Sequence, residues 1–319
     1  MSSSKHGLPL PLSRRRFLTG AAAVAGLILS PAALRAQALA DPVTVLALDG
    51  DALVTANGGE MRRLAETGKW TPLPAPGTAP VLSLATHASR PGLIVAGLAS
   101  GAAAVSVDGG RNWEDRNSGL PGGRIAALTV AATKPETFYA AVLGDGIWQS
   151  EDEGRTWSLA MDRPWLGEQE QDVLALASVE LATGMGGIWI YAGTSDGLTR
   201  VPDCFCRWQD VQPGDAMDAL VSGNAPTSAA PLPQGEAVQA LASAPSKPET
   251  LYAALPSGVW RSEDAGVVWS RLIKGRSSAI AVHPTNPSHV VAEIDGILQQ
   301  TTDGGAGWSA LQPPNGVLQ

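Results

Sequence analysis

Cysteine and histidine are scarce in this sequence, which limits how the chain can be held together and what chemistry it can carry. Of 319 residues, two are cysteine and four are histidine. Two cysteines cannot cross-link a chain of this length, so the fold has to depend on a hydrophobic core. The sequence also lacks a Cys-x-x-Cys-His haem motif, a glycine-rich phosphate loop and a serine nucleophile elbow, and its histidines are scattered. We therefore predict no cofactor and no metal site.

Basic residues are scarce beyond position 40. Five of the 22 basic residues and none of the 30 acidic residues lie in the first forty positions, which leaves 17 basic against 30 acidic residues and a net charge of −13 for residues 41–319. A surface with this charge repels nucleic acids and anionic membranes. Neither is expected as a partner.

The first forty residues have the pattern of an export signal. The basic stretch Ser13-Arg14-Arg15-Arg16-Phe17-Leu18 precedes an uncharged run over residues 19–34 and small residues suited to cleavage after Ala38 or Ala40. This order is typical of signal peptides, and the basic stretch resembles the twin-arginine (Tat) consensus. The apolar run is shorter than the ~20 residues of a spanning helix, and glycine, proline or charge interrupts every later one. We predict a Tat signal peptide at residues 1–40 and a periplasmic protein at residues 41–319, attached to a membrane only through an uncleaved signal.

Four segments of the chain share the pattern Ser/Thr-x-Asp-x-Gly-x-x-Trp. In a hairpin turn, Asp can hold exposed N–H groups and Gly can adopt a positive φ. The hydroxyl can bind the Asp carboxylate or the turn, and Trp can bury its ring while its N–H finds an acceptor. The shared positions are Ser106, Asp108, Gly110 and Trp113; Ser150, Asp152, Gly154 and Trp157; Ser262, Asp264, Gly266 and Trp269; and Thr301, Asp303, Gly305 and Trp308.

This repeat resembles the Asp-box, or BNR repeat, of sialidases, sortilin-type receptors, some xyloglucan-cleaving enzymes and a photosystem II assembly-factor family. The resemblance covers the repeat and implies a β-propeller. Two degenerate copies extend the series: residues 201–208 keep Asp203 and Trp208, and residues 55–62 keep only a turn. The six segments end 39 to 61 residues apart, near the ~40–50 residues of one four-stranded blade.

We therefore predict an all-β fold, a single β-propeller of six four-stranded blades over residues 41–319. In the third unit we expect strands at residues 124–131, 137–142, 146–150 and 157–160, and in the fifth at 238–243, 250–255, 258–262 and 269–273. We expect the first unit to lack its innermost strand, which residues 316–319 could supply. The ring would then be closed by N- and C-terminal strands, removing two exposed sheet edges.

Binding residues are expected on the rim away from the box turns, where the longest connections fall at residues 161–171 and 212–235. The second is rich in Ala, Pro, Ser and Gly and reads as a flexible insertion. The first is the stronger candidate, although a solvated acidic loop whose Trp covers a blade edge would look the same. Its candidate residues are Asp162, Arg163, Trp165, Glu168 and Glu170.

Other residues could face the same rim. Asp145, Asp196 and Asp295 each precede a glycine at matching places, where they would coordinate a cation, act as acid and base, or only form turns. Arg124 and Arg276 could join Arg163 there.

Cys204 and Cys206 stand two residues apart within the degenerate box of residues 201–208. Side chains at this spacing in a strand lie about 6.6 Å apart on one face, near the upper limit for a disulfide. A bond that pins the decayed turn is our preferred interpretation. A soft-metal or redox site and two free thiols remain alternatives.

The catalytic groups of a sialidase, which are three arginines, a Tyr–Glu pair and an acid Asp, are not evident. The three tyrosines, Tyr139, Tyr191 and Tyr252, repeat at one strand position, which indicates packing. We predict a non-catalytic extracytoplasmic propeller that binds a protein partner, as an assembly or accessory factor for a periplasmic redox complex. The alternative is a glycoside hydrolase or sugar-binding propeller, because a glycosidase needs only two suitably placed carboxylates.

Overall fold

The computed structural model describes residues 45–166, 168–181, 187–211 and 230–311, all within one compact unit of residues 36–319. Every regular element in these ranges is a β-strand. They contain no helix that is long and apolar enough to cross a membrane.

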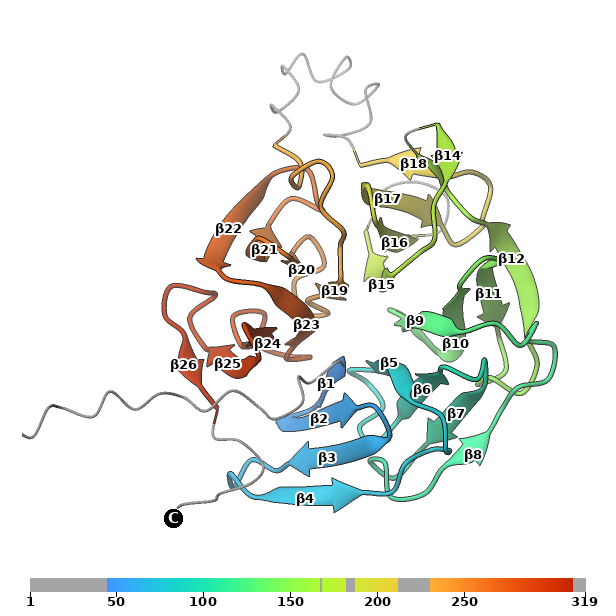
Figure 1. Ribbon diagram of the computed structural model, residues 1–319, viewed down its shortest axis with the longest axis horizontal. Helices are drawn as coiled ribbons and strands as arrows, with labels where there is room; N and C mark the ends of the chain where they lie inside the picture. Colours follow the sequence, from blue (N-terminus) through green and yellow to red (C-terminus); the bar gives the residue numbers. More distant parts are fainter. Residues whose placement is uncertain (1–44, 167, 182–186, 212–229, 312–319) are drawn as a thin grey trace, which may run out of the picture. The chain divides into compact units, whose positions relative to one another are not determined.

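Six sheets of four antiparallel strands form the molecule, and each is built from consecutive strands (Figure 1). The innermost strands surround the centre, and each contacts its neighbours in the ring, with β23 next to β1. The prediction of six four-stranded blades is therefore confirmed. The blades are blade 1, β1 (Val45–Asp49), β2 (Ala52–Asn57), β3 (Glu60–Leu64) and β4 (Trp70–Leu73); blade 2, β5 (Val81–Thr86), β6 (Ile94–Leu98), β7 (Ala103–Ser106) and β8 (Glu114–Asp115); blade 3, β9 (Ile125–Ala131), β10 (Lys134–Val142), β11 (Gly146–Ser150) and β12 (Ser158–Asp162); blade 4, β15 (Ala175–Glu180), β16 (Ile188–Thr194), β17 (Gly197–Pro202) and β18 (Gln209–Asp210); blade 5, β19 (Ala240–Ser243), β20 (Leu251–Leu255), β21 (Gly258–Ser262) and β22 (Trp269–Lys274); and blade 6, β23 (Ser277–Val282), β24 (Val290–Ile294), β25 (Ile297–Thr301) and β26 (Ser309–Ala310).

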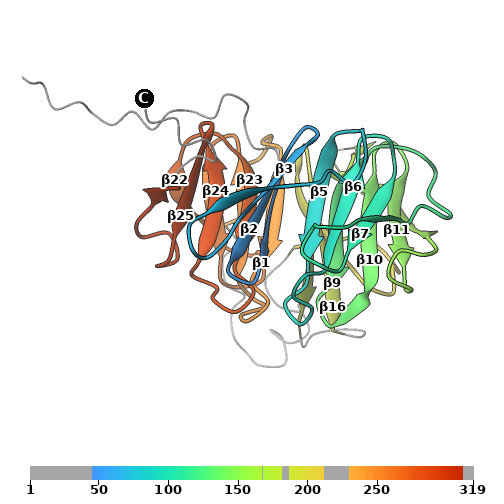
Figure 2. The same cartoon turned by 90° about the horizontal axis from the view of Figure 1, so that it is seen from below.

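The strands of each blade become more polar from the centre outward. The second strand of a blade is an apolar run buried on both faces, as in β16 and β20, because neighbouring blades cover both sides of it. The outermost strands are short and mostly exposed, as in β8 and β26. Figure 2 shows the strands running between the two rims of the ring.

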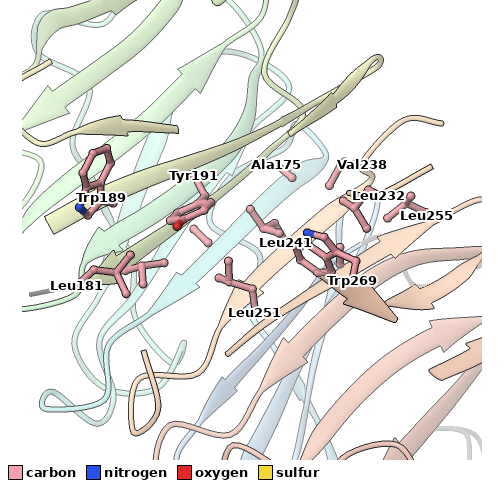
Figure 3. Close-up of a cluster of buried hydrophobic side chains, with 13 residues drawn as sticks. Ala175, Leu181, Trp189, Tyr191, Leu232, Val238, Leu241, Leu251, Leu255 and Trp269 are labelled. Carbon is pink, nitrogen blue, oxygen red and sulfur yellow. The ribbon is translucent and has the colours of Figure 1, made fainter. Parts of the chain in front are cut away.

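The hydrophobic core lies between adjacent blades. Between blades 4 and 5, Tyr191 of β16 packs in one buried cluster with Leu251 of β20 and Trp269 of β22 (Figure 3). Tyr139, Tyr191 and Tyr252 are at most 1% exposed, as expected for packing positions.

Six aliphatic side chains narrow the central channel. Each innermost strand contributes one of them at the same position, and all are buried. The six line both a cavity of ≈ 160 Å³ on one side and a cavity of ≈ 80 Å³ on the other, so they separate the two halves of the channel. These residues are Leu46, Leu84, Leu128, Leu176, Leu241 and Ile280.

The expectation that the first blade lacks its innermost strand is wrong. Strand β1 takes that place, and the turn at Gly58 joins β2 to β3 rather than the two outer strands. Residues 55–62 are therefore not a degenerate box, and blade 1 needs no donor strand. The proposed donor, residues 316–319, lies outside the described residues. Blade 6 meets blade 1 through a buried cluster that includes Leu48 and Ala281, and through a 2.9 Å contact between His283 and Asp51.

Candidate functional site

The two rims of the ring carry different connections. Because strands alternate in direction, the turns between third and fourth strands share a rim with the loops between first and second strands, here called the box rim. The turns between second and third strands and the connections from one blade to the next form the other rim, here called the opposite rim.

On the box rim, each of the four repeats forms the same hydrogen-bonded turn. In blade 3, Ser150 Oγ donates to Asp152 at 2.8 Å and accepts the Gly154 N–H at 2.8 Å. Asp152 in turn accepts the N–H and the hydroxyl of Thr156, and hydrogen bonds led by these lower its pKa to about 2. Corresponding bonds hold the turns that begin at Ser106, Ser262 and Thr301.

The box tryptophans connect neighbouring blades. The indole N–H groups of Trp113, Trp157 and Trp208 donate to backbone carbonyls just after, or at the end of, the outer strand of the preceding blade, over 2.9–3.0 Å. The acceptor for Trp208 is Asp162, so this candidate residue has a structural role through its backbone. Trp269 instead bonds Gly266 within its own turn, and its ring lies in the core between blades 4 and 5.

The residue between Asp and Gly of each box links its turn to two other segments. It has a positive φ of 57–77° in all four boxes. Its N–H donates to a carbonyl in, or just before, the second strand of its own blade. Its carbonyl accepts a hydrogen bond from a side chain of the preceding blade. These pairs are Gly109 with Arg63, Glu153 with Arg116, Ala265 with Tyr191 and Gly304 with Arg261.

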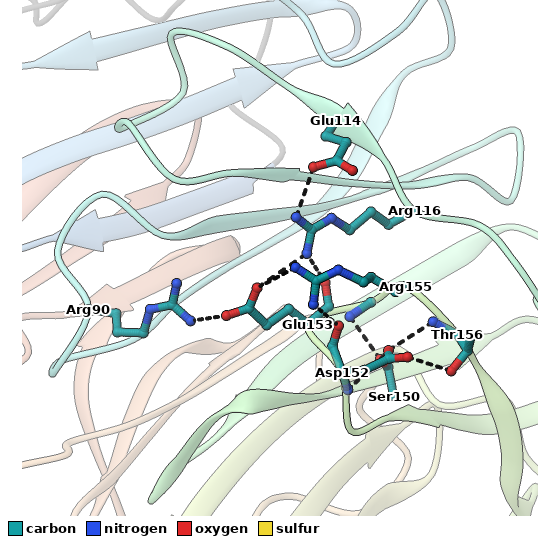
Figure 4. Close-up of polar contacts among 9 residues, drawn as sticks. Arg90, Glu114, Arg116, Ser150, Asp152, Glu153, Arg155 and Thr156 are labelled. Atoms are coloured by element: carbon teal, nitrogen blue, oxygen red, sulfur yellow. Dashed lines mark hydrogen bonds and ion pairs between the residues drawn. The ribbon is translucent and has the colours of Figure 1, made fainter.

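In blade 3 this link is reinforced by charge. The Glu153 carboxylate contacts Arg90 at 2.5 Å, Arg155 at 3.4 Å and Arg116 at 3.5 Å (Figure 4). The hydrogen bond from Arg90 is the largest cause of a lowered pKa at Glu153. These arginines therefore gather around the protein's own carboxylate, on the rim away from the predicted site.

Blade 4 replaces the box with a disulfide between Cys204 and Cys206. Phe205 between them has a φ of 50°, like the linking residue of a complete box. Its ring packs on Tyr139 of blade 3 at 5.6 Å, and Asp203 contacts Lys134 of blade 3 at 3.4 Å. The turn of blade 4, which lacks a complete box, thus still contacts the preceding blade through apolar and charged side chains.

On the opposite rim, the connection from blade 3 to blade 4 forms a small hairpin of β13 (Trp165–Leu166) and β14 (Gln169–Glu170). Arg163 binds Glu170 and lies 3.4 Å from Asp172. The structure thus brings Arg163, Trp165, Glu168 and Glu170 together in one element. Trp165 is 67% exposed, so it does not cover a blade edge.

Two residues that sequence reasoning left out of the site fix this hairpin in place. The buried Gln171 accepts the Ser195 hydroxyl at 2.5 Å, and Asp172 accepts the Gly144 N–H at 2.8 Å. Ser195 and Gly144 belong to the turns between second and third strands of blades 4 and 3. The hairpin is therefore bound to two blades. The sequence indicated this only through the position of Gln171 and Asp172 shortly before β15, from which their side chains can reach both turns.

The three matched aspartates are placed apart, in the turns of blades 3, 4 and 6. Asp145 accepts the Trp148 indole N–H at 2.5 Å, and Asp295 accepts the Arg276 backbone N–H at 2.8 Å. Asp196 is exposed in its turn. The described residues contain no group of three or more His, Cys, Asp and Glu suited to a metal ion.

The arginines are also separated. Arg124 directly precedes β9 of blade 3 and Arg276 directly precedes β23 of blade 6, on opposite sides of the six-membered ring (Figure 1). Arg163 belongs to the hairpin that is bound to the turns of blades 3 and 4, whereas Arg276 belongs to blade 6, so the three arginines do not converge on one ligand.

Two cavities in the central channel and one groove at the outer edge contain few ionisable side chains. The two channel cavities are below the ~300 Å³ at which ligand pockets begin, and His87 is the only ionisable residue that lines them. A groove of ≈ 400 Å³ lies at the outer edge between blades 1 and 2, lined by residues 74–77, Arg111, Asn112, Trp113 and Asp115. It contains one carboxylate, whereas glycoside hydrolysis needs two.

No protein-family model and no curated protein matches the sequence. Among solved structures, a GH74 enzyme of Niastella koreensis matches 86% of this chain with a TM-score of 0.58 and 16% identity, and the chain spans only 45% of that enzyme. The extracellular domain of the putative one component system BT4673 of B. thetaiotaomicron matches 81% of this chain, and 32% of its own, with a TM-score of 0.52 and 11% identity. YCF48 bound to D1 peptide matches 86% of this chain and 84% of its own at 14% identity, with a TM-score of 0.48, too low to support an inference. At these identities the likeness shows the propeller fold alone.

Proposed function

We propose that this protein is a non-catalytic propeller of the periplasm, exported by the twin-arginine pathway, which binds a protein partner on its opposite rim. Proteins with such signals are often exported folded and in company with cofactor enzymes. An assembly or accessory role in a periplasmic redox complex is therefore the role we favour.

The observation that carries this proposal is the use of the rim carboxylates. Asp145, Asp172 and Asp295 each accept an N–H group that fixes a turn, and Glu170 is paired with Arg163. Catalytic carboxylates need to face a substrate across a pocket of defined width. These side chains instead hold the turns in fixed conformations. The surface that the turns form is therefore rigid, and little conformational entropy is lost when a partner binds to it.

A sugar-binding or glycoside hydrolase function is the second candidate. The groove between blades 1 and 2 favours it, because Trp113, Asn112 and Asp115 could offer a ring face and hydrogen-bonding groups to a sugar. The fold likeness to a GH74 enzyme is compatible with this reading, but the chain matches less than half of that enzyme.

One experiment separates the two functions. The exported protein is used to capture partners from periplasm, and in parallel is incubated with a panel of oligosaccharide and polysaccharide substrates. We expect a stoichiometric protein partner and no turnover. Turnover that disappears on substitution of a groove or rim carboxylate, such as Asp115→Asn, would establish the enzyme instead.

A further inference from the structure

The hairpin of residues 163–166 and 168–172 is an addition to the propeller repeat. Its two strands form a separate sheet, and no other blade-to-blade connection among the described residues contains one. The hydrogen bonds of Gln171 and Asp172 hold it to the turns of blades 4 and 3. The six blades close into a ring without this hairpin. We therefore relate its attachment to the surface that it exposes rather than to the stability of the ring.

Trp165 is the most exposed large hydrophobic side chain of the described residues, at 67%. A tryptophan buries about 150–250 Å² when it is covered, and tryptophans in rigid surroundings are typical hot spots of protein interfaces. Its cross-strand neighbour is Glu170, which Arg163 holds in place. The ring therefore stands on a backbone that is already ordered before any partner binds.

The charged residues around Trp165 are mostly acidic. The hairpin region carries Asp162, Glu168, Glu170 and Asp172 against Arg163 alone, and the two turns that it contacts add Asp145 and Asp196. Of these, Glu170 and Asp172 are bound by Arg163, while Asp162 and Glu168 are exposed. A second copy of this chain would bring the same negative charges face to face, which disfavours self-association here.

We infer that Trp165 inserts into an apolar pocket bordered by lysine or arginine on a polypeptide partner, with Glu168 and Asp162 facing the basic residues. This inference rests on the proposed function and specifies its partner. Neither channel cavity nor the groove between blades 1 and 2 includes a hairpin residue, and the feature that the hairpin presents is the 67% exposed ring of Trp165.

The test begins with a random dodecapeptide library displayed on phage and selected on the folded full chain. Enriched peptides are then synthesised and their affinities measured at 50 and 300 mM NaCl. We expect peptides that combine an aliphatic or aromatic residue with flanking Lys or Arg, and that bind several-fold more weakly at the higher salt concentration.

Four variants locate the binding surface. Trp165→Ala should weaken peptide binding about 30-fold or more, the size of effect seen at interface hot spots. Glu168→Lys should weaken it roughly fivefold through like charge. The matched controls are Val107→Ala, the other large hydrophobic side chain of the described residues that is more than 60% exposed, and Glu151→Lys in the box of blade 3. Both lie on the box rim and should leave affinity unchanged.

Three outcomes of the peptide selection would overturn the inference: no enrichment above the bare support, enrichment of acidic peptides, or peptides that bind Trp165→Ala as well as the unaltered chain. Binding to a glycan array that is lost in Trp165→Ala would assign the surface to sugars and also exclude a polypeptide partner. If a partner captured from periplasm remains bound to Trp165→Ala, the hairpin inference fails while the proposed function stands.

Discussion

The box rim and the opposite rim are built from the same strands but use their polar residues in different ways. On the box rim one hydrogen-bonded turn recurs four times, and one backbone carbonyl of each copy accepts a hydrogen bond from a side chain of the preceding blade. On the opposite rim, among the residues that the structure describes, one blade-to-blade connection carries an extra hairpin and the others do not. Repetition on one rim secures the ring, which leaves the other rim free to vary around a binding surface.

Two tryptophans provide the sharpest test of this difference. Trp157 on the box rim is 5% exposed, packs on Phe138 and bonds Arg116, whereas Trp165 on the opposite rim is 67% exposed. Trp157→Ala should lower the free energy of unfolding by about 3–5 kcal/mol, and Trp165→Ala by no more than about 0.5 kcal/mol. Urea denaturation of both variants measures this. Equal losses would mean that the hairpin is part of the ring's structural framework.

Two serines repeat the comparison on a smaller scale. Ser150 is buried and its hydroxyl has three hydrogen bonds in its box, while the hydroxyl of the exposed Ser195 has one, to Gln171. Ser150→Ala should cost about 1–3 kcal/mol of stability and Ser195→Ala less than about 1 kcal/mol. The same urea titrations decide the matter. A larger loss of unfolding free energy in Ser195→Ala would contradict the view that the box rim stabilises the ring more than the opposite rim does.

The sequence was sufficient to predict what depends on local turn chemistry. The strands predicted at residues 146–150 and 258–262 have the predicted bounds, because a box follows each directly and Gly opens each. The first blade was misread because Asn57-Gly58-Gly59 favours any tight hairpin and does not distinguish an inner turn from an outer one. As a result, each strand of this blade was assigned to the place of the next strand outward.

The links between blades could not be predicted, because they join residues far apart in the chain. Arg116 lies 37 positions from Glu153, and Tyr191 lies 74 positions from Ala265. The sequence indicated a packing position for Tyr191 but not the carbonyl that its hydroxyl reaches. Burial raises the pKa of this tyrosine, so the hydroxyl remains a donor. Likewise, an Asp-Gly pair indicates a turn without showing whether its carboxylate faces a ligand or, as in Asp295, the backbone.

Acid should weaken the box rim. Hydrogen bonds, led by those to Asn112 and Thr156, lower the pKa values of Asp108 and Asp152 to about 2 from an ordinary 3.8. The folded state then holds fewer protons than the unfolded state, so this stabilisation is complete above pH 4 and is lost as the pH falls towards 2. Urea midpoints measured from pH 7 to pH 2 should show this decline. The double variant Asp108→Asn, Asp152→Asn should be less stable at pH 7 and show a flatter decline; an unchanged slope would assign the acid sensitivity to other groups.

The smallest effects on stability are expected at the residue between Asp and Gly of each box. Glu153 and Ala265 hold the positive φ that Gly109 and Gly304 adopt in blades 2 and 6. Glycine at either site relieves a left-handed backbone that costs other residues about 1 kcal/mol or more. Ala265→Gly should therefore stabilise the protein by up to about 1 kcal/mol, since its carbonyl still meets Tyr191.

Glu153→Gly makes the same backbone change but removes the carboxylate that Arg90, Arg116 and Arg155 share. Partly exposed ion pairs contribute roughly 0.2–1 kcal/mol each, so the loss of three pairs should offset all or most of the gain from the backbone change. The difference in unfolding free energy between the two glycine variants then measures what the arginine cluster adds to the link between blades 2 and 3. If Glu153→Gly gains as much as Ala265→Gly, the cluster adds nothing, and the backbone carbonyl alone accounts for the link on the box rim.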